Sequence, residues 1–170
     1  RESQTQYRFN NQAYFQRNFM PGMLGWFKMT AETSLEDIEW MLTKSAGYEA
    51  GYALVADPES IAQNGNSDII FEKVGDWEKL RLSNVFTESQ KSAMRDNNKE
   101  FTLKRIDNQS WSWQAVHSHI FTHQKKVRQP GEPLNSTFSF VNAASEQPLQ
   151  FLLSAQNSAL SEISLEINNY

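Results

Sequence analysis

The spacing of apolar residues changes once along this chain, and the change limits the folds that are open to it. Up to about residue 98, apolar residues fall in short continuous runs or in stripes with the helical period of 3.6. From Phe101 onward they alternate with polar residues, as in "FTLKRI" and "WSWQAVHSHIF". This pattern predicts an α+β chain in two parts, residues 1–98 and residues 99–170.

The first part is predicted to be a βαβα segment. The runs "MLGWFKM" and "YEAGYALVA" have the length and apolar content of parallel strands that are buried on both faces. Helix caps, capping boxes and terminal glycines predict helices at about 33–47, 57–64, 67–83 and 87–97. In the third of these, Ile70, Val74, Trp77 and Leu80 share one apolar face.

The second part is predicted to be an antiparallel, β-sandwich-like domain. Asp107-Asn108 is a turn between the first two alternating runs. The runs "STFSFVN", "PLQFLLSA" and "EISLEI" bring the set to about five strands, and prolines punctuate them. The boundary between the two parts is expected near residues 97–100.

Composition excludes several classes of function. Hydrophobic residues make up 39% of the chain and charged residues 21%, as in a globular protein. With a net charge of −4 and no basic run, nucleic acid is not an expected partner. No apolar run is long enough to span a membrane. No cysteine and no glycine-rich phosphate loop are present, and no cofactor is expected.

Three stretches are similar to one protein family. They are "YRFNNQAYFQRNFMPGMLGWFKM", "DIEWMLTKSAGYEAGYAL" and "HQKKVRQPGEPLNSTFSFVNAASEQPLQFLL". They resemble the C-terminal region of secreted gut-bacterial glycoside-hydrolase-like proteins, in which a (β/α)8 barrel is followed by an all-β domain. The resemblance implies a role in polysaccharide utilisation and an extracellular or periplasmic location. It also implies that Met23–Met29 and Tyr48–Val55 are the last two barrel strands.

A pair of barrel strands cannot close a barrel, which needs eight strands. Both edges of such a pair are unpaired, so we expect a partner segment or a second copy of the chain to cover them. The chain begins with Arg1 and is expected to be a processed product or a piece of a longer protein. The earlier barrel strands carry several catalytic groups in such enzymes, so the catalytic residues here are unknown and this chain alone is expected to be inactive.

The carboxyl ends of the two predicted parallel strands carry the first candidate site. Trp26 could stack on a sugar ring and Glu32 could bind hydroxyl groups, since the active site of a barrel lies at this end. Asp57 could complete the carboxyl pair that a glycosidase needs. The alternative roles are a core position for Trp26, a solvated loop position for Glu32 and the N-cap of a helix for Asp57.

The alternating part carries the second candidate site. Trp111 and Trp113 lie on one face of a predicted strand, and two indoles there could form a platform for a carbohydrate. His117 and His119 continue the same face as weak candidates for a metal site, but no carboxylate in the segment completes a ligand set. The alternatives are a core face of the sandwich and a partly buried cluster of histidines.

Three functions remain open. The first is a non-catalytic C-terminal portion of a carbohydrate-active protein, which supports the barrel or binds a poly- or oligosaccharide. The second is an active glycoside hydrolase that missing sequence or another chain completes. The third is a structural or interaction module without a sugar ligand.

Overall fold

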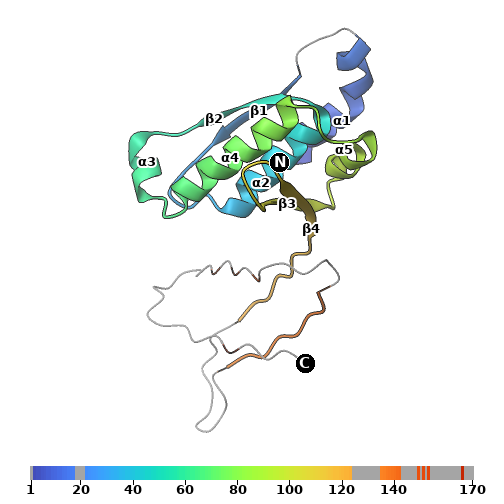
Figure 1. Ribbon diagram of the computed structural model, residues 1–170. Helices are drawn as coiled ribbons and strands as arrows, with labels where there is room; N and C mark the ends of the chain where they lie inside the picture. The colour runs from blue at the N-terminus through green and yellow to red at the C-terminus, as the bar shows by residue number, and fades with distance from the viewer. Residues whose placement is uncertain are drawn as a thin grey trace.

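The computed structural model describes residues 2–17, 22–123 and 135–142, and the single residues 149, 151, 153 and 166. These residues mix helices and strands, so the α+β class is confirmed (Figure 1). The elements in chain order are α1 (Glu2–Arg17), β1 (Met23–Lys28), α2 (Leu35–Tyr48), β2 (Gly51–Val55), α3 (Pro58–Gln63), α4 (Ser67–Leu82), α5 (Glu88–Arg95), β3 (Glu100–Arg105) and β4 (Trp111–Val116).

Three helices begin at the caps that the sequence predicts. The Ser34 side chain accepts a hydrogen bond from the backbone N–H of Asp37, and Asp57 accepts one from the backbone N–H of Ser60. Thr87 forms a capping box with the third residue of α5. Helix α1 was not expected, because its apolar residues are spread around the helix and form no stripe.

Strands β1 and β2 pair in parallel, and α2 connects them. The register places Trp26 opposite Ala53 and Lys28 opposite Val55. It slips between Met23 and Trp26, where β1 advances three residues while β2 advances two. Gly25 lies in this β-bulge with a φ of 147°, a backbone conformation that residues with a Cβ rarely adopt.

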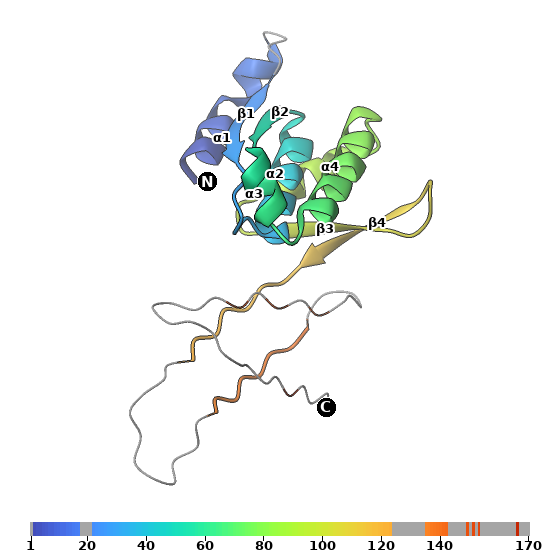
Figure 2. The same cartoon turned by 90° about the vertical axis from the view of Figure 1, so that its left-hand side faces the viewer.

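The bulge decides which face of β1 each side chain occupies. Leu24 and Met29 are buried in the core, whereas Met23 is 51% exposed and Trp26 is 72% exposed. The expectation that both faces of this strand are buried is therefore wrong. Helices α2 and α4 lie together on one side of the β1–β2 pair, and α1 lies beside β1 and contacts both β1 and α2 (Figure 2).

The core lies between the β1–β2 pair, the helices and the β3–β4 hairpin. Helix α2 is its centre, since it contacts α4, α5, β1 and β3. From Ile38 to Tyr48 every residue of α2 is buried. Trp77 of α4 is 1% exposed, which confirms its predicted place on the apolar face.

The β3–β4 hairpin is antiparallel and turns at Asp107, as predicted. The Asp107 side chain accepts hydrogen bonds from the backbone N–H groups of Gln109 and Ser110, both at 2.8 Å. Phe101 and Leu103 of β3 enter the same core as the helices. The boundary near residue 98 stays a prediction.

The predicted sandwich also stays a prediction. Two of its strands are present as β3 and β4. The third run, "STFSFVN", lies within residues 135–142, which form no regular strand, and most of "PLQFLLSA" and "EISLEI" lies outside the described residues.

Candidate functional site

The carboxyl ends of β1 and β2 carry two loops that a buried asparagine joins. Asn64 is 4% exposed, and its side-chain amide donates hydrogen bonds to the carbonyl oxygens of Thr30 and Thr33, both at 2.9 Å. The Thr33 hydroxyl also accepts a hydrogen bond from the backbone N–H of Thr30 at 2.8 Å. The turn after β1 is therefore fixed by its own side chains and by the segment after α3.

Two predicted site residues lie on or next to this turn. The Trp26 ring stands on the exposed face of β1, two residues before the strand ends. Glu32 is exposed on the turn, and one of its carboxylate oxygens accepts a hydrogen bond from the Thr30 hydroxyl at 3.1 Å. An aromatic face and a carboxylate thus belong to one strand end and its adjoining turn.

Asp57 lies on the neighbouring loop, directly after β2. It is exposed and caps α3, and its two carboxylate oxygens accept hydrogen bonds from the backbone N–H and the hydroxyl of Ser60 at 2.8 and 3.0 Å. These bonds, with a smaller contribution from the Lys28 ammonium, hold the pKa of Asp57 below its ordinary value. A carboxylate held in its ionised form can bind a hydroxyl or a cation but is a poor general acid.

Trp111 and Trp113 lie on the face of the hairpin that meets the helices. Trp113 stacks on Phe101 with ring centroids 4.4 Å apart, and both tryptophans pack against the core while staying partly exposed. The Lys79 ammonium lies 4.6 Å from the centre of the Trp111 ring. One side of each indole is therefore in contact with the protein, and only part of either ring is exposed to a sugar.

His117 and His119 are exposed beyond the end of β4. His119 lies beside Phe140, and Phe121 stacks on Phe138, with centroid distances of 5.1 and 4.8 Å. His123 Nδ1 lies 2.7 Å from the Ser136 hydroxyl. Residue 119 thus faces 140, residue 121 faces 138 and residue 123 faces 136. These pairs have the order of two segments that run antiparallel.

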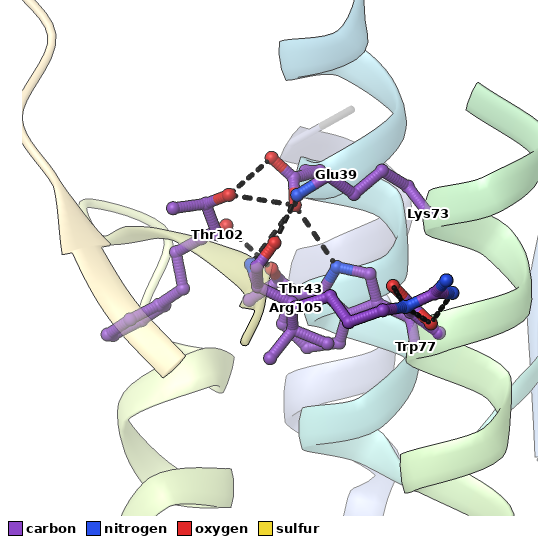
Figure 3. A network of polar contacts seen from close by, with 9 residues as sticks. Glu39, Thr43, Lys73, Trp77, Thr102 and Arg105 are labelled. Atoms are coloured by element: carbon purple, nitrogen blue, oxygen red, sulfur yellow. Dashed lines mark hydrogen bonds and ion pairs between the residues drawn. The ribbon is translucent and has the colours of Figure 1, made fainter. Parts of the chain in front are cut away.

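A buried polar network joins α2, α4 and β3 (Figure 3). Glu39 is 7% exposed and accepts hydrogen bonds from the Trp77 indole N–H at 3.3 Å and the Leu103 backbone N–H at 3.1 Å. The Thr102 hydroxyl lies 2.8 and 2.9 Å from the two carboxylate oxygens, and Lys73 Nζ lies 3.2 Å from one of them. With this many donors, the carboxylate is fully engaged by the protein and serves to hold the hairpin on the helices.

A second ion-paired group reinforces the same junction. The Arg105 guanidinium binds both carboxylate oxygens of the buried Asp76, and another of its nitrogens lies 3.2 Å from Glu72. Lys73 also donates a hydrogen bond to the Leu103 carbonyl. The hairpin is thus attached to α4 by its side chains and its backbone.

Sequence reasoning missed Glu39 and Asn64. The charged residues of "SLEDIE" are of the kind found on a solvated helix face, and Glu36 and Asp37 are indeed exposed, but Glu39 is buried. Glu39 directly follows Ile38 in the apolar stripe of α2, and a carboxylate in that place is the signal that could have found it. Asn64 was read as a helix end, and nothing local marks its contact with Thr30.

Within the residues that the structure describes, no three histidine, aspartate or glutamate side chains group in a way that could hold a metal ion. In the same residues, no helix is both long and apolar enough to cross a membrane. Comparisons with protein-family models, with curated proteins and with solved structures find no match to this chain.

Proposed function

We propose that this chain is the C-terminal, non-catalytic portion of a carbohydrate-active, glycoside-hydrolase-like protein. The observation that carries the proposal is that, among the described residues, helices cover only one face of the parallel pair β1–β2. Helices α2 and α4 cover one face, while Trp26 and Val55 are 72% and 44% exposed on the other. Parallel strands in α/β proteins are normally covered on both faces, and a barrel achieves this by curling the uncovered face inward.

The elements around the pair support the same proposal. A short helix, α3, lies between β2 and the long helix α4, and barrels frequently carry a short extra helix after their last strands. Trp26 opposite Ala53 is a large side chain beside a small one, which suits the packed layers inside a barrel. Helix α1 contacts β1 and leaves Trp26 exposed, so the end of the strand where a barrel binds its substrate is open.

The β3–β4 hairpin is consistent with a role in supporting the barrel. Glu39 and Asp76 bind β3 to the same two helices that would form the outer wall of the barrel. Residues 99–170 would then form the sandwich-like domain that follows the barrel, with β3 and β4 as its attachment. A poly- or oligosaccharide is the proposed ligand of the whole protein, and an extracellular or periplasmic location follows from the same resemblance.

The experiment titrates soluble polysaccharides against the intrinsic tryptophan fluorescence of the chain. One exposed ring and one carboxylate contribute little free energy after the cost of ordering a glycan, so we expect a Kd on the order of 1 mM. Trp26→Ala should abolish the response. Trp111→Ala is the matched control, since that ring already lies against the protein, and it should retain the response.

The same samples test for turnover. We expect no release of reducing sugar, because the part of the chain that the structure describes establishes no pair of carboxyl groups facing one bond. Robust hydrolysis by the purified 170 residues would overturn the non-catalytic proposal and favour an active hydrolase completed by another copy.

The inward position of Trp111 and Trp113 favours a second candidate, a structural module without a sugar ligand. Absence of any fluorescence response, in the parent and in both variants, would select this candidate.

A further inference from the structure

Lys44 is a lysine in the centre of the fold. It lies on α2 with 0% of its surface exposed, and its ammonium reaches the corner where α5 ends and β3 begins. Its Nζ donates hydrogen bonds to the carbonyl oxygens of Met94 at 2.9 Å, Asp96 at 2.5 Å and Lys99 at 3.5 Å. An ammonium group has three N–H donors, and here each donor has one backbone acceptor.

These three acceptors are the backbone of one turn. Met94 is in the last turn of α5 and Asp96 is its C-cap, so Lys44 satisfies carbonyl groups that the helix itself leaves without donors. Lys99 precedes Glu100, the first residue of β3. The ammonium therefore links the end of a helix to the start of the hairpin.

We propose that Lys44 stabilises the α5–β3 corner in a proton-dependent way. When it is protonated it donates hydrogen bonds to three carbonyl groups, and when it loses a proton it releases the carbonyl group of Lys99. A neutral amine has two N–H donors and one lone pair. The two shorter hydrogen bonds, to Asp96 and Met94, keep the donors, and the lone pair then faces the carbonyl oxygen that is already the most distant. The start of β3 would loosen while the end of α5 stayed capped.

The surroundings bring this titration near neutral pH. Burial lowers the pKa of Lys44 to about 8, and the carboxylates of Asp96 and Glu100 oppose that shift only in part. Of the positive charges near the corner, Lys91 and Arg95 are engaged elsewhere, and Lys99 shares Asp96 with Lys44. Lys91 pairs with Glu49 at 2.5 Å, Arg95 donates a hydrogen bond to the Gly47 carbonyl at 2.8 Å, and Lys99 Nζ lies 3.6 Å from Asp96. The Trp40 ring, 5.8 Å away, lines the remaining side.

The titration of Lys44 changes global stability and the Lys44–Lys99 contact in opposite directions as the pH rises. Because the folded pKa lies below the value of the unfolded chain, the unfolded chain binds more protons between about pH 8 and pH 10.5. The contribution of Lys44 to global stability is therefore present above that window and is lost as the pH falls through 8. In the folded chain, the contact with Lys99 weakens as the pH rises through about 8.

The test follows the full chain by NMR from pH 6.5 to pH 10, with 15N and 13C labels that report the Lys44 side chain and the backbone amides. The expected result is a Lys44 midpoint near pH 8 and a step with the same midpoint at the amide of Glu100. In Lys44→Arg, whose guanidinium stays protonated, this amide step should be absent. If that variant does not fold, Lys44→Met, which carries no titrating group, should also lack the step.

Lys104→Met is the control, because Lys104 is exposed on β3 and should leave the Glu100 step unchanged. A Lys44 midpoint at the ordinary lysine value would overturn the proposal. So would a Glu100 amide that stays constant while Lys44 titrates, or a step that persists in Lys44→Met.

Discussion

Removing the Glu39 carboxylate should release the hairpin from the helices at a cost that the contacts define. In Glu39→Ala the Trp77 indole N–H and the Leu103 backbone N–H lose their acceptor. Each buried donor left without a partner costs about 1–3 kcal/mol. Lys73 adds an unpaired charge, which its 19% exposed side chain can partly solvate. We therefore expect a loss of about 3–5 kcal/mol in unfolding free energy, as for other broken buried pairs.

The assay is urea unfolding, monitored by far-ultraviolet circular dichroism and tryptophan fluorescence. Glu36→Ala on the same helix is the control. Glu36 is exposed near the start of α2, where a carboxylate contributes about 0.3–1 kcal/mol through the helix dipole. The double variant Glu39→Leu with Lys73→Met removes both members of this ion pair, so neither charge is left unpaired, and it should lose less than Glu39→Ala. A loss below about 1 kcal/mol in Glu39→Ala would refute the assignment of this carboxylate as the link between α2, α4 and β3.

Trp77→Ala should cost about 3–5 kcal/mol in the same assay, because it empties a fully buried volume on α4, and a loss below about 1 kcal/mol would contradict that burial. Gly47→Ala should cost about 1–3 kcal/mol, since a Cβ there would lie 2.8 Å from the Met94 Cβ, and an unchanged unfolding midpoint would show that α5 can move aside. Limited proteolysis should cleave first in the exposed residues 97–99, and cleavage confined to residues beyond 101 would count against the predicted boundary.

The helices could be predicted because their starts depend on neighbours in the sequence. Ser34, Asp57 and Thr87 each bind a backbone group three residues ahead, so the cap and its partner lie within one short window. The same holds for the turn at Asp107, which binds groups two and three residues ahead. Where the chemistry is local, pattern and structure agree.

The contacts that fix the tertiary arrangement are not local. Glu39 binds Leu103 across 64 positions, and Asn64 binds Thr30 across 34. From neighbouring residues alone, Glu39 fits a solvated helix face and Asn64 fits a helix end. Because these local roles already account for both residues, the sequence does not reveal their distant partners. Of the residues singled out for function, Trp26 and Glu32 share a strand end and its turn, whereas Trp111 and Trp113 turn toward the core because β3 and β4 bury one face.

Gly25 determines which side chains lie on the exposed face of β1. In a regular strand, residues two apart share a face, so Leu24 and Trp26 would point the same way. The bulge at Gly25 changes this relation, so that Leu24 enters the core and the Trp26 ring is left in solvent. A residue with a Cβ at this φ would be strained, and a regular strand in its place would carry Trp26 toward the helices and remove the aromatic face from the open side. The aromatic side chain on the open face of the β1–β2 pair therefore depends on a backbone irregularity in β1.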